Sequence, residues 1–200
     1  MKKLTCIILI FLNVSFAFAQ KTDTVKSNYI KTADPTVAMR NIDGIMMYSG
    51  NNLIENISLS PQFTILVNLI KAAGLTDSFK TGIVTFFAPT NGAFAKLAPG
   101  ILDTLLLPAH KTDLINLLNH HAVSGNITSR DIERQIKAGN GQATFTSLSG
   151  ELLIAQINEN RNIVLTDENG EQTVITRLNI RQDNGMLFIV NTVLLPKAKQ

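Results

Sequence analysis

Hydrophobic residues between positions 60 and 138 repeat with the period of α-helices. Ser60 and Pro61 are typical of a helix start, because serine caps free N–H groups and proline fits the first turn. Gly74 suits the left-handed position that follows a helix. The apolar residues between them lie at i, i+3, i+4 and i+7: Phe63, Leu66, Val67 and Ile70. Similar spacing predicts helices over residues 101–106 and 112–122, and a short helix that begins after Thr128 or Ser129.

Beyond Gly139 the period changes from that of a helix to that of a strand. Alternating residues predict five strands, over 143–148, 152–157, 163–166, 173–178 and 186–194. Turn residues separate them, among them Asn169-Gly170 and Asn184-Gly185, and Asn-Gly is a strong hairpin signal. Helices followed by strands indicate an α+β domain.

A strand and a helix meet near residue 89. Residues 83–88 are β-branched and aromatic, as in a buried strand. Pro89 lacks an N–H group and should end the strand, while Thr90 can cap the next helix. Pro89 and Phe94 then occupy the two positions of a hydrophobic staple.

The N-terminus predicts export. Lys2 and Lys3 precede the apolar residues 7–18, and Ala17-Phe18-Ala19 is a typical cleavage site before Gln20, so residues 1–19 read as a signal peptide. The polar residues 20–40 read as a flexible arm, and residues 41–197 as one domain. Residues 41–58 are apolar enough to dock on that domain. The chain is therefore expected to be secreted, periplasmic or at the cell surface, with no transmembrane segment after cleavage.

Composition excludes several classes of chemistry. The single cysteine, Cys6, lies inside the predicted signal peptide, so the mature chain has no thiol nucleophile and no disulfide. Without Lys2 and Lys3, sixteen basic residues face fifteen acidic ones, a net charge of about +1. So small a charge does not indicate a nucleic-acid partner.

The histidine pair His120-His121 is the first place to look for a reactive site. Adjacent side chains on a helix point about 100° apart and cannot easily bind one metal together. No Gly-x-Ser-x-Gly motif supports a serine hydrolase. Asp167 and Glu168 read as a solvated turn. We therefore expect no catalytic residue, metal or cofactor.

Three segments resemble the signatures of the fasciclin-like (FAS1) family: residues 85–94, 117–125 and 184–196. The resemblance implies a FAS1 fold, a compact β-sandwich or wedge with helices packed along one side and edge. It also implies that the signature residues are mainly structural: Thr85, Phe86, Phe87, Ala88, Pro89, Thr90, Asn91, Phe94, His121, Asn184, Gly185, Val190 and Pro196. In the family, the histidine matching His121 is buried and bonds near the first signature. The preceding tyrosine is His120 here, and a usual His and Asp near the C-terminus are Phe188 and Asn191.

The resemblance and the signal peptide together predict a secreted or cell-surface, non-catalytic binding or adhesion module. Its partner would be a protein or an extracellular matrix component. The alternative is a periplasmic or extracellular binder of a small ligand or glycan, although the chain lacks tryptophan and has only Tyr29 and Tyr48 for stacking on sugars. The candidate interaction surface comprises Asn91, Gly92, His120, Ser124, Gly125 and Asn126. An exposed apolar patch would favour a protein partner, and a deep pocket with converging polar groups a small ligand.

Overall fold

A computed structural model describes residues 37–197. Its first part is a hairpin of β1 (Met39–Ile42) and β2 (Ile45–Tyr48), followed by α1 (Leu53–Leu59). Asn52 and Glu55 form a capping box at the start of α1. Apolar side chains from this part lie in the core: Ile42, Met47, Leu53, Ile54 and Ile57. The predicted signal peptide, and the predicted arm as far as residue 36, fall outside the described residues.

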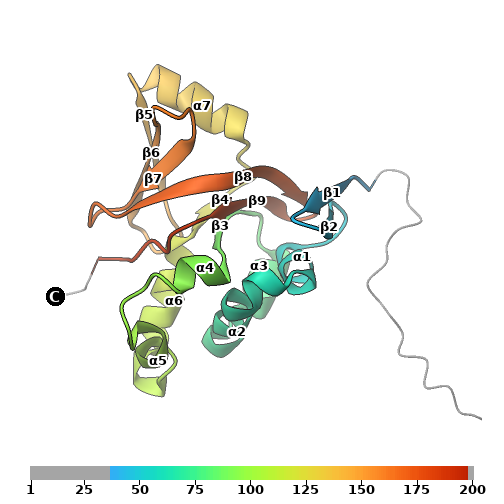
Figure 1. The fold of residues 1–200 in the computed structure, drawn as a ribbon, viewed down its shortest axis with the longest axis vertical. Coiled ribbons are helices and arrows are strands. Elements are labelled where there is room, and N and C mark those ends of the chain that lie inside the picture. Colours follow the sequence, from blue (N-terminus) through green and yellow to red (C-terminus); the bar gives the residue numbers. More distant parts are fainter. Residues whose placement is uncertain (1–36, 198–200) are drawn as a thin grey trace, which may run out of the picture. The chain divides into compact units, whose positions relative to one another are not determined.

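A layer of short helices follows. It comprises the 3-10 turn η1 (Pro61–Phe63), α2 (Thr64–Ala73), α3 (Thr76–Thr81), α4 (Asn91–Phe94), α5 (Ile101–Leu105), the 3-10 turn η2 (Pro108–His110) and α6 (Lys111–His120). Gly74 ends α2 with a φ of 77°, as its sequence position predicted. Ser60 makes no capping bond through its side chain, contrary to the sequence prediction. Figure 1 shows α1 to α6 together on one side of the strands.

The remaining strands form one seven-stranded sheet in the order β4-β3-β9-β8-β7-β6-β5. Its members are β3 (Val84–Pro89), β4 (Ala122–Ser124), β5 (Gln142–Thr146), β6 (Leu152–Ile157), β7 (Ile163–Thr166), β8 (Gln172–Gln182) and β9 (Gly185–Val190). Among the strands of residues 37–197, β3 and β9 are the one pair that runs parallel. The sheet curls until its two edges meet, because Val123 of β4 bridges to Ser147 just beyond β5. Figure 1 shows the helix α7 (Ser129–Ala138) beside β5 and β6.

The curled sheet separates two apolar cores, and β3 contributes to both. Successive side chains of a strand point to opposite faces. Phe86 therefore packs among the helices, with its ring edge-on to Phe79, while Phe87 enters the sheet core and stacks on Phe188. All six residues of β3 are buried as a result. This arrangement of helices packed beside a mixed sheet confirms the predicted α+β class.

Several element boundaries differ from the sequence prediction. The helix expected to reach residue 122 ends at His120, and β4 begins two residues later. β8 extends to Gln182, past bulges near Arg177, and β9 ends at Val190. β1 begins at Met39, two residues before the predicted start of the domain.

Candidate functional site

The strand-to-helix corner is a network of internal bonds. The Thr90 hydroxyl accepts a hydrogen bond from Ala93 N–H (3.2 Å) and caps α4, as predicted. The Asn91 amide donates to Pro61 O (2.9 Å) and Thr64 Oγ1 (2.8 Å), and its oxygen accepts from Ile65 N–H (3.0 Å). Asn91 therefore joins α4 to the start of α2.

Thr85 holds the turn that follows β4. Its hydroxyl donates to Gly125 O (2.8 Å) and accepts from Ile127 N–H (2.8 Å). Because β3 and β4 are antiparallel, this turn lies at the start of β3, whereas Asn91 and Gly92 follow its end. The fold thus places the two loops of the predicted interaction surface at opposite ends of one strand.

Asn184 and Gly185 join β9 to the helices. The Asn184 side chain accepts from Leu53 N–H (3.0 Å) and donates to Phe79 O (2.8 Å) and Gly82 O (2.9 Å). Gly185 has a φ of 140°, and a Cβ atom there would lie 1.9 Å from the carbonyl oxygen of Val84. Only glycine fits this close approach of two backbones.

His121 is buried and fully hydrogen-bonded. Its Nδ1 donates to Leu117 O (3.0 Å), and its Nε2 accepts from Leu194 N–H (3.1 Å). Burial lowers the pKa of His121 from 6.5 to about 4, so the ring is neutral near pH 7. The ring thus contacts the last signature segment, while the His121 carbonyl accepts from Phe87 N–H (2.8 Å) in the first.

His120 is also buried, although the sequence prediction had placed it on the interaction surface. Its Nδ1 lies 3.3 Å from both Ser149 Oγ and Glu151 Oε2. Its Nε2 is buried and has no hydrogen-bond partner among residues 37–197. Burial lowers the pKa of His120, opposed by the charges of Glu151, Asp167 and Glu168.

The group of His120, Ser149 and Glu151 is not arranged as a hydrolase triad. In such a triad the serine and the acid contact opposite nitrogens of the imidazole. Here both lie near Nδ1. The ring therefore cannot take a proton from Ser149 on one side while Glu151 orients it on the other.

Asp167 corrects a sequence-based interpretation. We expected a solvated turn, but Asp167 is only 4% exposed. Its Oδ1 accepts from Asn169 and Glu171 N–H (both 2.9 Å), and its Oδ2 accepts from Leu195 N–H (3.1 Å). Asp167 and His121 together hold residues 191–196, which we call the closing segment.

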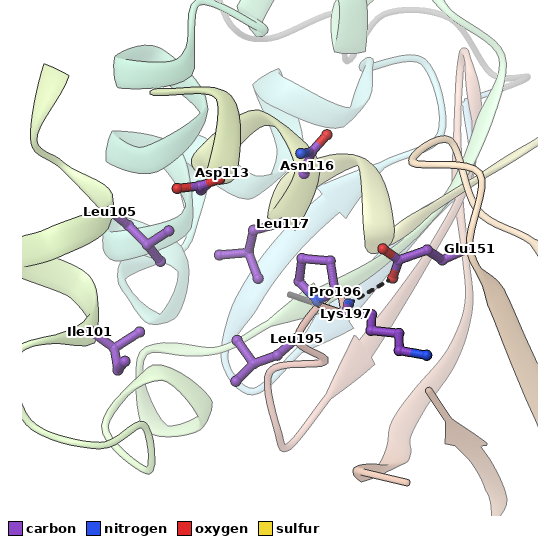
Figure 2. Close-up of a pocket in the computed structure, with 9 residues that line it drawn as sticks. All are labelled: Ile101, Leu105, Asp113, Asn116, Leu117, Glu151, Leu195, Pro196 and Lys197. Atoms are coloured by element: carbon purple, nitrogen blue, oxygen red, sulfur yellow. Dashed lines mark hydrogen bonds between the residues drawn. The ribbon is translucent and has the colours of Figure 1, made fainter. Parts of the chain in front are cut away.

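A cavity of about 220 Å³ lies between α5, α6 and the end of the closing segment. Figure 2 shows its apolar walls, which are Ile101 and Leu105 from α5, Leu117 from α6, and Leu195 and Pro196. Asp113, Asn116, Glu151 and Lys197 supply its polar groups. Glu151 Oε2 accepts a hydrogen bond from Lys197 N–H (3.1 Å), drawn as a dashed line.

Two exposed leucines directly follow α5, the helix that forms one wall of this cavity. Within the described residues α5 buries no side chain, and Leu106 and Leu107 just after it are 51% and 53% exposed. We call Ile101, Leu106 and Leu107 the α5 surface. The sequence predicts an ordinary helix over residues 101–106, and the apolar residues at 106 and 107, outside the i, i+4 stripe of Ile101 and Leu105, are the signal that could have indicated an exposed surface.

The other predicted surface residues have mixed positions. Gly92, Ser124 and Asn126 are exposed, and Asn91 and Gly125 are half-buried. Their role in binding stays a prediction.

Among residues 37–197, no three His, Cys, Asp or Glu side chains are grouped as metal ligands. In that same part of the chain no single helix is long and apolar enough to cross a bilayer; α1 with η1–α2 meets the criterion only as a pair bent by 112°.

Comparisons with known proteins agree on the family. The model of the Fasciclin domain matches residues 61–196. Protein sll1483 of Synechocystis sp. is 31% identical over 181 residues, covering 90% of this chain and 86% of that protein. Transforming growth factor-beta-induced protein ig-h3 of Sus scrofa is 29% identical over 140 residues, which are 70% of this chain but 18% of that protein.

A solved FAS1 domain pair from the insect cell adhesion molecule Fasciclin I has a similar structure. The TM-score is 0.64 at 12% identity, covering 80% of this chain and 67% of that one. At so low an identity the similarity shows the fold alone.

Proposed function

Because the chain belongs to the fasciclin domain family, we propose that it is a non-catalytic binding module that docks onto a protein or a matrix component outside the cell. The α5 surface is the observation that carries this proposal. Three large aliphatic side chains are exposed to water there. The apolar residues of the neighbouring α6, Leu114, Leu117 and Leu118, are by contrast buried in the core. Apolar side chains that gather on a surface favour association with a partner.

The signature residues support a scaffold function. Four of them form side-chain hydrogen bonds with other parts of the domain: Thr85, Asn91, His121 and Asn184. A side chain with such bonds cannot turn to a substrate without leaving a buried group unpaired, which costs about 1–3 kcal/mol. The domain is therefore suited to presenting a rigid surface.

Export is part of the proposal and depends on the sequence of residues 1–19. Cleavage after Ala19 would leave Gln20 as the first residue. N-terminal sequencing of the protein from producing cells and their medium tests this. A chain that still begins with Met1 would contradict export by this signal.

Binding through the α5 surface is tested by comparing captured proteins. The full mature chain, immobilised, is exposed to surface proteins of the producing cells and to extracts of their surroundings. The double variant Leu106→Ser/Leu107→Ser should lose specific partners. Lys137→Ser, at an exposed position of α7, is the matched control and should retain them. The same captured set with all three proteins would overturn the proposal.

The alternative, a small-ligand or glycan binder, has the cavity in its favour. Its volume of about 220 Å³ lies below the roughly 300–1,000 Å³ of typical ligand sites. Its walls are mainly aliphatic, which suits an apolar group better than a sugar. A protein partner therefore has the stronger support.

A further inference from the structure

We propose that the cavity receives one apolar side chain of the partner protein, and that Glu151 and Asp113 attract a basic side chain next to it. This inference rests on the proposed function and names the chemistry of the partner. The occupant is a protein segment in which an aromatic or aliphatic residue adjoins a lysine or arginine.

The shape of the cavity favours a single anchor. Figure 2 shows Ile101 and Leu105 on one side, with Leu195 and Pro196 facing them and Leu117 between. A volume of about 220 Å³ suits one side chain better than a whole small molecule. Protein interfaces commonly depend on a few anchors of this kind, inserted into pockets and surrounded by contacts that exclude water.

The α5 surface supplies such surrounding contacts. Leu106 and Leu107 follow directly on α5, whose Ile101 and Leu105 form one wall of the cavity. Ile101 belongs to both the wall and the exposed surface. When one side chain of the partner enters the cavity, the neighbouring residues of the partner would therefore cover the exposed leucines.

The polar groups at the cavity favour a cation. Glu151 is 19% exposed, and its contacts within residues 37–197 to Lys197 N–H and His120 Nδ1 both use Oε2. A carboxylate accepts through both oxygens, so Oε1 can accept another donor. Asp113 contributes a second carboxylate, which contacts His110 Nδ1 (2.8 Å). Lys197, the lysine among the residues that line the cavity, extends its side chain away from the apolar walls in Figure 2.

Three capped peptides test this chemistry: acetyl-Gly-Phe-Lys-Gly-amide, acetyl-Gly-Phe-Glu-Gly-amide and acetyl-Gly-Ser-Lys-Gly-amide. Each is titrated into the full mature chain labelled with ¹⁵N, and the amide signals are followed by NMR. The Phe-Lys peptide should shift the amides of Leu105, Leu117 and Glu151 in a saturable way. The Phe-Glu peptide should bind at least about fivefold more weakly, and the Ser-Lys peptide should not saturate.

Variants separate the charge from the apolar pocket. Glu151→Gln should remove most of the preference for Phe-Lys over Phe-Glu and retain the Phe-dependent shifts. Glu133→Gln, the same change on α7, should leave both unchanged. If Glu151→Gln lowers the melting temperature strongly, the test uses Asp113→Asn, on the exposed side of α6, in its place. This variant should reduce part of the preference for Phe-Lys over Phe-Glu.

Equal binding of the Phe-Lys and Phe-Glu peptides by the wild-type chain would overturn the charge preference. Peptide shifts that avoid the cavity residues, or none at all, would overturn the whole inference. The proposed function is tested separately by the capture experiment with Leu106→Ser/Leu107→Ser. Loss of partners in that experiment without peptide binding leaves the docking function standing and removes only this account of the partner.

Discussion

The signature segments and the α5 surface use their side chains in opposite ways. In the signature segments, both ring nitrogens of His121 have partners, the Asn184 side chain makes three bonds, and Gly185 leaves no space for a methyl group. At the α5 surface, by contrast, leucines about half exposed contribute little to the core. The first region is needed for the fold, and the second has apolar area left for a partner. Changes in the two regions should therefore have very different effects on stability.

The largest loss is expected from Gly185→Ala. The added Cβ would lie 1.9 Å from Val84 O, so the pairing of β3 with β9 must shift. We expect a loss of about 4 kcal/mol or more, or failure to fold. Gly170→Ala is the control, because Gly170 has a φ of 83° but nothing within 4 Å of a built Cβ. It should lose only about 1–2 kcal/mol. Denaturant unfolding measures both, and similar losses would contradict the steric explanation.

The second largest loss of stability is expected from His121→Ala. It leaves Leu194 N–H without its acceptor and creates a cavity, so about 2–3 kcal/mol of stability should be lost. His110→Ala, at a half-exposed position, should change stability by less than about 0.5 kcal/mol. Thermal and denaturant unfolding compare the two. A His121→Ala variant that melts like the wild type but loses a partner would show that His121 belongs to a binding site.

Stability should depend on pH in the range set by His121. Its pKa falls from 6.5 to about 4 on folding, so between these values the unfolded chain binds more protons. Stability is fully present above pH 6.5 and falls as the pH drops towards 4, by about 2 kcal/mol between pH 7 and pH 5. The lowered pKa of His120 acts in the same direction.

The contribution of His121 is isolated by variants. His121→Gln removes the titrating group, so its unfolding free energy should change less between pH 7 and pH 5 than that of wild type. Leu107→Ser, which changes an exposed side chain without a titrating group, should keep the wild-type slope. If the unfolding free energies of His121→Gln and of the wild type change equally with pH, the pH dependence arises from other groups.

His120→Phe should have a small effect, although it changes the neighbouring buried residue. The ring it replaces has an Nε2 without a partner in the described part of the chain. The substitution removes this unpaired nitrogen together with the 3.3 Å contacts of Nδ1 to Ser149 and Glu151. Ser149 and Glu151 keep partners in Ser147 Oγ and Lys197 N–H, so we expect a change within about 1 kcal/mol in the free energy of unfolding. His121→Phe, by comparison, removes two recorded bonds and should cost more. If the two variants unfold at the same denaturant concentration, this distinction is wrong.

The smallest effect on stability is expected from Leu107→Ser. Its side chain is 53% exposed, so the free energy of unfolding should change by less than about 0.5 kcal/mol. Leu117→Ser, on the buried wall of the same cavity, is the contrasting variant and should destabilise strongly. A strongly destabilised Leu107→Ser chain would mean that the α5 surface also supports the fold.

The differences between prediction and structure arise where pairing is non-local. The three residues of β4 are too few to show a period, and their strand exists because β3 lies beside them. Asp167 looks like any turn residue in the sequence, but the closing segment brings Leu195 to it. His120 was expected on the surface because its burial depends on Ser149 and Glu151, about 30 positions away. None of these neighbours can be seen in local sequence.

The sequence by itself determined most of the helices between residues 60 and 138, the buried strand before Pro89, the five C-terminal strands, and the order of these elements. The period of apolar residues, the capping residue Thr90 and the glycines at positions 74 and 185 act on near neighbours or on backbone angles, so they can be read along the chain. Only the tertiary structure decided which polar groups are buried and where apolar side chains stay exposed. Those properties depend on segments that meet after folding, as when the closing segment meets α5 and α6 to form the cavity. The physical reason is that burial and bonding are properties of contacts in space, and most of these contacts join residues far apart in the chain.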